Sequence, residues 1–362
     1  MTEVMLWGPP VVPSDPLDPA FRSDMETWMQ KCVNSGVKRI IGGDRTLVLT
    51  EVARSNNIDV HPYVNFNSFP RHGSARQSYG WSLDFLRPDV DAAEAREILD
   101  RCRPIYDDPK INTSITDFAS KHPEFRSLTR DRSYTLQPDQ DLYLSLAFPE
   151  VRREQTQKFI DDLETTDGSG IQVEFVLGNE DENGVVTYGY EDAVVEEFKS
   201  KTGKDPFSIP NDDPDWMQFR ADYTTRYLIE LRDAVKKTKP GAVFSVTLIA
   251  GEAGDYIKLL HDWPAWVEQN AVDEIFFWFR TNSNLKDLER QIKHAADVVN
   301  GRCKVVAELS CYHPNSFQTP ELMLEAGRIA KDNGADSVGI YRTHGVEQLD
   351  FWHVLESFSK MS

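Results

Sequence analysis

The sequence has few cysteines and lacks the short motifs that mark several common classes of site. Its four cysteines, Cys32, Cys102, Cys303 and Cys311, are widely spaced and form no CxxC pair. This spacing argues against a zinc ribbon or a disulfide scaffold and favours free thiols. No GxGxxG motif, Walker motif or GxSxG elbow occurs, which argues against nucleotide binding and serine-hydrolase chemistry. We therefore expect no cofactor.

The sequence also lacks metal-binding histidine patterns, long apolar runs and an excess of positive charge. The eight histidines show no HxH or HExxH spacing, so no metal site is expected. No apolar run approaches the roughly 18 residues of a membrane span, and the start of the chain does not resemble a secretory signal. The 59 acidic residues against 40 basic ones give a net charge of -19, which disfavours nucleic acid as a partner. We predict a soluble protein that does not bind membranes, cytoplasmic unless a leader has been removed; nothing indicates its oligomeric state.

Short β-branched and aromatic runs alternate with amphipathic helical stretches along the whole chain, and this alternation predicts a parallel sheet. Strands are expected at residues 4–7, 38–41, 59–66, 170–177, 243–249, 274–279, 304–309 and 337–341. Helices are expected at 23–35, 44–55, 92–103, 150–163, 192–202, 218–237, 256–269, 285–299, 320–333 and 349–358. Eight strands, each followed by a helix, make a (β/α)8 TIM barrel, and we expect residues 1–362 to form this single domain.

Two insertions interrupt the alternation, at about residues 67–141 and 178–216. They follow the third and fourth strands, so we expect them to lie over the C-terminal rim of the barrel. Barrel enzymes place their chemistry at that rim, on residues from several strand ends. The strand ends are therefore the place to look for a site.

Two glutamates, Glu174 and Glu308, interrupt otherwise apolar strands. A charge within a buried strand costs several kcal/mol unless it is paired, hydrogen-bonded or neutralised. One interpretation is an ion pair with Arg280 or Arg342 that only closes the barrel. The functional interpretation is the carboxyl pair of glycoside hydrolysis, in which one group protonates the leaving oxygen and the other attacks or activates water. The sequence leaves open which of the two is the acid.

Glu180 is a rival candidate for catalysis. The Asn179-Glu180 pair follows the fourth strand and resembles the acid/base of the large clan of retaining barrel glycosidases, whose nucleophile on the seventh strand would again be Glu308. Acidic neighbours surround Glu180, so a solvated acidic loop is the simpler explanation.

Further candidates at the strand ends fit substrate binding. Aromatic rings can stack on sugar faces, and arginine recognises carboxylate or sulfate in a bidentate manner. The predicted binding residues are Trp7, Tyr63, Asn65, Asn67, Arg71, Trp278, Arg280, Tyr312, His313, Tyr341, Arg342 and His344. Core packing of the rings and charge balance by the arginines are the structural alternatives.

The middle of the chain carries several short motifs in a defined order. They are HPEF at 122–125, LSLAFPEVR at 144–152, GIQVEF at 170–175, YGY at 188–190, FKSKTGKDP at 198–206, WMQFRADY at 216–223, KPG at 239–241 and GADS at 334–337. Together they resemble the glycosyl-hydrolase-like proteins labelled "family 10-like", which are common in bacteria that degrade polysaccharides. The resemblance spans roughly residues 120–340 and implies a TIM barrel with glycosidase activity. Where the family typically reads Asp-Gly-Ile-x-Leu-Asp, this chain has SGIQVE at 169–174, so the acidic group of Glu174 is one methylene longer.

We interpret the chain as a glycoside hydrolase that cleaves a polysaccharide by a two-carboxylate mechanism. The arginines at the strand ends suggest an anionic glycan, sulfated or containing uronate, as one class of substrate. Two other hypotheses stay open. One is a glycan-binding barrel without catalysis, and the other is a lyase or isomerase on uronate-like sugars with Tyr341 or His344 as base.

Overall fold

The computed structural model describes residues 3–42, 47–65, 68–69, 93, 97, 101, 118, 121–133, 142–175, 180–250 and 255–361. Within these ranges the strands are β1 (Glu3–Trp7), β2 (Val37–Ile41), β3 (Asp59–His61), β4 (Tyr63–Asn65), β5 (Ser68–Phe69), β6 (Leu142–Tyr143), β7 (Gly170–Glu174), β8 (Val243–Ile249), β9 (Glu274–Phe279), β10 (Lys304–Ser310) and β11 (Ser337–Tyr341). The helices are α1 (Phe21–Asn34), α2 (Val48–Ser55), η1 (Pro123–Phe125), α7 (Pro149–Thr166), α8 (Asp192–Thr202), α9 (Pro214–Thr238), α10 (Asp255–Lys258), α11 (Trp263–Glu268), α12 (Leu285–Val299), α13 (Pro320–Asp332), α14 (Thr343–Gln348) and α15 (Trp352–Ser359).

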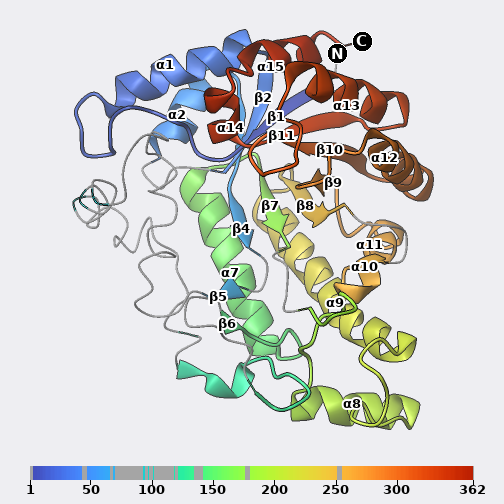
Figure 1. Cartoon of the computed structure of the whole chain (residues 1–362). Coiled ribbons are helices and arrows are strands. Elements are labelled where there is room, and N and C mark those ends of the chain that lie inside the picture. Colours follow the sequence, from blue (N-terminus) through green and yellow to red (C-terminus); the bar gives the residue numbers. More distant parts are fainter. Residues whose placement is uncertain are drawn as a thin grey trace.

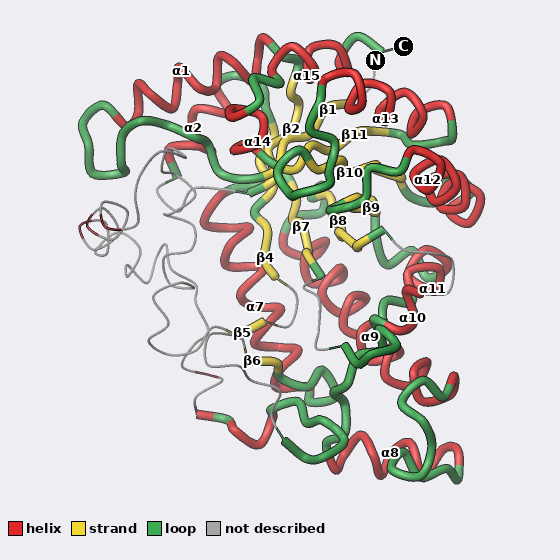
Figure 2. Tube along the Cα trace, in the orientation of Figure 1, coloured by secondary structure: helices red, strands yellow, loops and turns green. Residues whose placement is uncertain are grey.

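The main sheet is a (β/α)8 TIM barrel, as predicted. Its strands follow the order β3-β2-β1-β11-β10-β9-β8-β7-β4 and all pair in parallel. The two ends of this order, β3 and β4, are halves of one strand separated by Pro62, so the ring closes through a single segment. Helices surround the strands, and the two termini lie close together on one side of the molecule (Figure 1). The strands of the main sheet lie together at the centre of the barrel, with helices around them (Figure 2).

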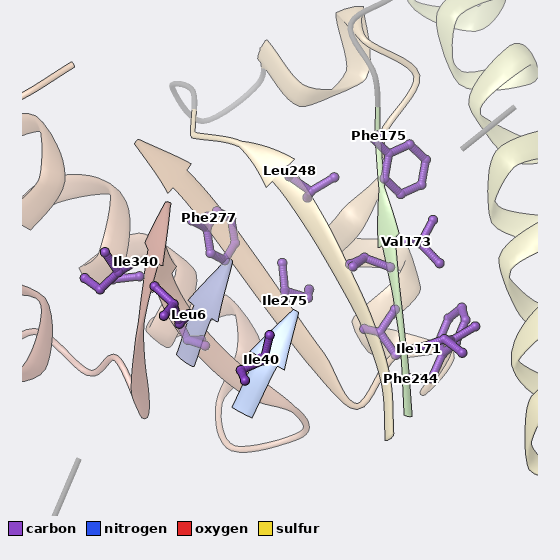
Figure 3. Packing of buried hydrophobic residues seen from close by; sticks show 14 of the residues in the cluster. Leu6, Ile40, Ile171, Val173, Phe175, Phe244, Leu248, Ile275, Phe277 and Ile340 are labelled. Carbon is purple, nitrogen blue, oxygen red and sulfur yellow. The ribbon is translucent and has the colours of Figure 1, made fainter. Parts of the chain in front are cut away.

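Residues along each strand alternate between two cores, because successive side chains of a strand point to opposite faces. The outer core lies between the strands and the helices and includes residues such as Leu6, Val173 and Phe277 (Figure 3). The inner core fills the barrel and holds Met5, Trp7, Ile41, Phe276 and Val306, with Tyr63 and Tyr341 packed against it. A residue next to an outer-core residue on the same strand therefore faces the barrel interior.

Polar side chains occupy the N-terminal end of the barrel interior. Arg39 on β2 pairs with Glu274 on β9, with its Nη2 atom 3.3 Å from Oε1, and Ser245 donates to Oε2 of Glu274 at 2.8 Å. Close by, Gly170 makes room for the buried ring of His61, since a Cβ at this glycine would lie 2.6 Å from the ring carbon Cε1.

The structure differs from three of the sequence expectations. The strand expected at 59–66 is divided at Pro62, which has no N–H to donate to a ladder but accepts a hydrogen bond from the Gln172 N–H at 2.9 Å. The helix expected at 256–269 is two helices, α10 and α11, because the Asp262 side chain caps a new helix start by accepting from the Ala265 N–H. The last helix expected at 349–358 is preceded by α14, which begins directly after β11.

The fourth strand was expected to reach residue 177, and the structure describes it as ending at Glu174. Most of the helix expected at 92–103 lies outside the described residues. In the described part of the chain, no helix is both long and apolar enough to cross a membrane.

Candidate active site

Glu174 and Glu308 both face the interior of the barrel. Glu174 is the last residue of β7, and its neighbours Val173 and Phe175 belong to the outer core. Glu308 lies on β10 between Ala307 and Leu309, which are also outer-core residues. Glu308 is fully buried. The alternation of each strand thus directs both carboxyl groups inward.

Burial and neighbouring charges shift the pKa values of both carboxyl groups. Burial raises the pKa of Glu174 to about 7, while the positive charges of Arg280 and Arg342 act in the opposite direction. The pKa of Glu308 is raised well above its ordinary value, first by burial and then by the negative charge of Glu174. Since the charges of both arginines favour the ionised form of Glu174, the first proton is lost there, and Glu308 keeps its own.

A short chain of hydrogen bonds holds Glu308 in place. The Gln172 amide donates to the hydroxyl oxygen of Thr247 at 2.8 Å, and that hydroxyl donates to Oε2 of Glu308 at 3.3 Å. In the sheet register Thr247 is the cross-strand partner of Glu174. One threonine therefore lies beside the first glutamate and is bonded to the second.

A cluster of rings gathers at the ends of β9, β10 and β11. The His313 ring stacks on Tyr341 with ring centroids 5.5 Å apart and planes 11° apart. Trp278 lies against the same tyrosine, with a centroid distance of 4.6 Å. Tyr312 is 41% exposed and lies beside His313. The cluster presents both flat apolar faces and polar edges.

Two arginines accompany these rings. The Arg280 guanidinium lies 5.4 Å from the ring centroid of Trp278, and that of Arg342 lies 4.4 Å from Tyr312. Burial, together with the charges of Arg280 and Arg342, lowers the pKa of His313 to about 4. The imidazole is thus neutral at physiological pH, and the fixed positive charge of this region belongs to the arginines.

Several buried polar atoms around the carboxyl pair have no hydrogen-bond partner among the described residues. They are Trp7 Nε1, Trp278 Nε1, Arg280 Nε, His313 Nε2 and Glu308 Oε1. A buried polar group without a partner costs about 1 to 3 kcal/mol, and such groups in native proteins usually pair with water or a ligand. Donors and acceptors of this kind suit a ligand rich in hydroxyl groups.

The ion-pair interpretation of the two glutamates is supported only by the charges of Arg280 and Arg342, which lower the pKa of Glu174. No ion pair within 4.0 Å joins either of them to an arginine in the part of the chain that the structure describes. The ion pair that spans the barrel interior is instead Arg39–Glu274, on residues that the sequence did not single out.

Glu180 lies outside the barrel strands, in a loop where it forms an isolated bridge with Val186. Its side chain is exposed, and its pKa is raised by partial burial against a smaller opposing effect of a backbone hydrogen bond. Among the described residues, neither Glu174 nor Glu308 is a cause of this shift.

The remaining predicted residues are distributed as follows. Trp7 is 1% exposed and packs between Tyr63 and Tyr341, with centroid distances of 5.3 and 5.9 Å. His344 is buried in α14 near Tyr312. Asn67, Arg71 and the side chain of Asn65 lie outside the described residues.

Gln172 is a site residue that the sequence analysis missed, and Thr247, near the end of the fifth expected strand, was given no role there. Both sit two residues from another inward-facing polar residue on their own strand, Glu174 and Ser245, and this period of two was the available signal. Their roles depend on strand register, which the sequence alone does not reveal. No group of three or more His, Cys, Asp or Glu side chains in the described ranges could hold a metal ion.

Comparison with known proteins agrees with the barrel architecture. The family model described as Glycosyl hydrolase-like 10 matches residues 87–318. None of the curated proteins matches the sequence.

Among solved structures, the chain is similar to the glycoside hydrolase domain of PgaB (BpsB) from Bordetella bronchiseptica, with a TM-score of 0.62 and 11% identity, covering 100% of this chain and 99% of that one. A polyextremophilic β-galactosidase from the Antarctic haloarchaeon Halorubrum lacusprofundi has a TM-score of 0.60 and 11% identity, covering 99% of this chain and 58% of that one. A β-galactosidase from Marinomonas ef1 has a TM-score of 0.57 and 10% identity, covering 94% of this chain and 54% of that one. At these identities the similarity concerns the fold.

Proposed function

Because the chain belongs to the Glycosyl hydrolase-like 10 family, we propose that it is a carbohydrate-active enzyme that hydrolyses glycosidic bonds within a polysaccharide. The observation that carries this proposal is the pair of inward-facing glutamates, Glu174 and Glu308, at the C-terminal half of the barrel. Glycoside hydrolysis requires two carboxyl groups in different protonation states. Burial and the charge of Glu174 raise the pKa of Glu308, whereas the charges of Arg280 and Arg342 lower that of Glu174, and this supplies the difference.

In this proposal Glu308 is the general acid and Glu174 is the carboxylate. Burial and the charge of Glu174 keep Glu308 protonated, so it has a proton to give to the leaving-group oxygen. The charges of Arg280 and Arg342 favour the ionised form of Glu174, so it can attack the anomeric carbon or accept a proton from water. The role of each glutamate therefore follows from the burial and the charges around its carboxyl group.

The ring cluster supports binding of a sugar next to this pair. Pyranose rings present C–H groups that pack against aromatic faces, and Trp278, Tyr312 and Tyr341 offer such faces. The unpaired indole N–H of Trp278 and the imidazole nitrogen Nε2 of His313 match the hydroxyl groups on the edge of a sugar.

An anionic glycan is the substrate class that the two arginines favour. The buried Nε atom of Arg280 has no hydrogen-bond partner within the described residues, and a guanidinium binds sulfate or carboxylate in a bidentate manner. We expect Arg280→Ala and Arg342→Ala to reduce hydrolysis of sulfated or uronate-containing glycans more than that of neutral ones. Equal losses on both kinds of glycan would assign the arginines to charge balance of Glu174 instead.

The experiment that tests the proposal is reducing-end release from a panel of neutral, uronic and sulfated polysaccharides. Glu174→Gln and Glu308→Gln should each lower release by a factor of about 10² to 10⁴, the usual contribution of a general acid or base. Glu182→Gln is the matched control, because Glu182 is an exposed glutamate of the loop after β7. Activity that survives in both interior variants but is lost in Glu180→Gln would transfer the role to Glu180. Glycan binding without release by the parent protein would favour a non-catalytic barrel, and ultraviolet-absorbing unsaturated products would favour a lyase.

A further inference from the structure

The carboxyl group of Glu308 has two oxygens in different surroundings. Oε2 accepts a hydrogen bond from the Thr247 hydroxyl at 3.3 Å. Oε1 is buried and has no partner among the described residues. A protonated carboxyl group carries its proton on one oxygen only, so this asymmetry decides where the proton resides.

The direction of the hydrogen bond to Oε2 follows from its other member. A threonine hydroxyl has one proton to donate. The Gln172 amide donates to the same hydroxyl oxygen at 2.8 Å, so the threonine proton is left to point at Glu308. All three residues are buried, with exposed fractions of 0% for Gln172, 1% for Thr247 and 0% for Glu308, so water from the bulk does not compete for these bonds.

We propose that Thr247 is a positioning residue that, oriented by Gln172, holds Oε2 of Glu308 and leaves the acidic proton on Oε1. The carbonyl oxygen of a protonated carboxyl group accepts hydrogen bonds, while its O–H donates. With Oε2 engaged as the acceptor, Oε1 carries the O–H and is the atom that donates to a substrate oxygen. This inference rests on the proposed function only for that last role, because the arrangement of the bonds does not depend on a substrate.

The charged groups around the pair must be considered in any test by pH. They are Glu174 at the end of β7 and, past the ends of β9 and β11, Arg280 and Arg342; His313 also titrates in this region. Thr247 adds no charge, so replacing it changes the hydrogen bond and leaves those electrostatic influences in place.

The test is the pKa of Glu308 in the substrate-free protein, measured from its carboxyl band by infrared titration and assigned by the loss of that band in Glu308→Gln. Thr247→Val removes the hydroxyl at nearly constant volume. A hydrogen bond donated to the carboxyl group favours its ionised form, so we expect Thr247→Val to raise the pKa by about one unit. Thr247→Ser should restore the parent value, and Thr50→Val is the control for loss of a buried threonine hydroxyl elsewhere.

A fall in the pKa of Glu308 in Thr247→Val would overturn the proposal. If Glu308 instead donates its proton to Thr247, the bond favours the neutral form, and Thr247→Val lowers the pKa; an unchanged pKa would also contradict the proposal. If Thr247→Val does not fold, Gln172→Met releases the orientation of the hydroxyl without removing it. We then expect a smaller rise of the pKa, and no rise would count against the proposal.

Activity separates this inference from the proposed function. If the protein hydrolyses a glycan, the alkaline limb of its pH profile should move upward in Thr247→Val by the same amount as the infrared pKa and return in Thr247→Ser. A limb that stays in place while the pKa moves would overturn the positioning role in catalysis. Movement of the infrared pKa in a protein that cleaves no glycan would support the hydrogen-bond chain and reject the proposed function.

Discussion

Arg39 and Glu274 form an ion pair across the barrel interior, although their strands β2 and β9 are not neighbours in the sheet. Both side chains are almost fully buried, at 3% and 1% exposure. The pair therefore joins opposite walls of the barrel below the candidate active site.

Removing one member of this pair should strongly destabilise the fold. Arg39→Met removes the buried cation beside Glu274 and leaves only the half-exposed Lys304, whose Nζ lies 3.5 Å from Oε1; breaking a buried pair typically costs about 3 to 5 kcal/mol. We expect a loss of that size in the free energy of unfolding, measured by urea denaturation. The double variant Arg39→Met with Glu274→Leu should recover most of it. Arg54→Met, which breaks the exposed pair with Asp167, is the control and should change stability by less than about 1 kcal/mol. If Arg39→Met and Arg54→Met lowered the free energy of unfolding by equal amounts, the prediction would be contradicted.

The activity of the proposed hydrolase should rise through neutral pH. Its carboxylate, Glu174, has a pKa of about 7, so the active ionised form accumulates as the pH increases past that value. The charges of Arg280 and Arg342 lower this pKa, and Arg280 has the larger effect. In Arg280→Gln the acidic limb of the pH profile of kcat/KM should therefore move to higher pH. Arg328→Gln, a change on the exposed face of α13, should leave the limb in place. A downward shift in Arg280→Gln would show that another group controls the limb.

Glu191 should make the protein less stable as the pH rises from about 4.5 to 7. This carboxyl group is buried at the start of α8, accepts from the Leu128 N–H at 3.0 Å, and has a pKa raised by burial to about 7. Between the ordinary pKa and the raised one, the folded state binds a proton that the unfolded state has released, so the free energy of unfolding falls with increasing pH.

Replacement by glutamine should remove this dependence while keeping an acceptor for Leu128. At pH 8 we expect Glu191→Gln to be more stable than the parent by on the order of 2 to 3 kcal/mol. At pH 4.5 the two proteins should unfold at similar denaturant concentrations. Glu268→Gln, on an exposed glutamate of α11, provides the control. A stability difference that does not depend on pH would reject the titration of Glu191 as its cause.

Tyr312 should contribute to substrate affinity and little to the chemical step. Its ring is partly exposed and lies against the Arg342 guanidinium. Tyr312→Ala should raise KM about fivefold, which corresponds to roughly 1 kcal/mol of stacking, with kcat nearly unchanged. Tyr312→Phe should behave like the parent protein. A fall in kcat without a change in KM would place the ring in the chemical step instead.

The fold was predictable where local signals were strong. The limits of β8, β9 and β11 agree with the sequence expectations to the residue, because these short segments are rich in β-branched and aromatic residues and are bounded by turn or polar residues. The helix α12 was also placed correctly, since Asn284 precedes it and caps it through the N–H groups of Lys286 and Asp287. The split between α10 and α11 was missed although the sequence carries a signal for it, since Asp262 is an N-cap residue type and Pro264 lies in the first turn of α11.

The site was predictable only in part, for a reason of geometry. A polar residue within an apolar strand signals an inward position, and this drew attention to Glu174 and Glu308. Which side chains surround them depends on how far neighbouring strands are shifted along the barrel, and that shift leaves no mark in the sequence. The bond from Thr247 to Glu308 and the stacking of His313 on Tyr341 are therefore results of the structure alone.

The position of β1 in the ring has a consequence for synthesis of the chain on the ribosome. This first strand pairs with β2 on one side and with β11, the last strand to be made, on the other. Until residues 337–341 emerge, the nascent barrel has two unpaired edges, on β1 and β10. Exposed strand edges pair readily with other chains, so the interval before β11 is made is when this protein is most exposed to aggregation. Chains that end prematurely before Ser337 keep those edges permanently open.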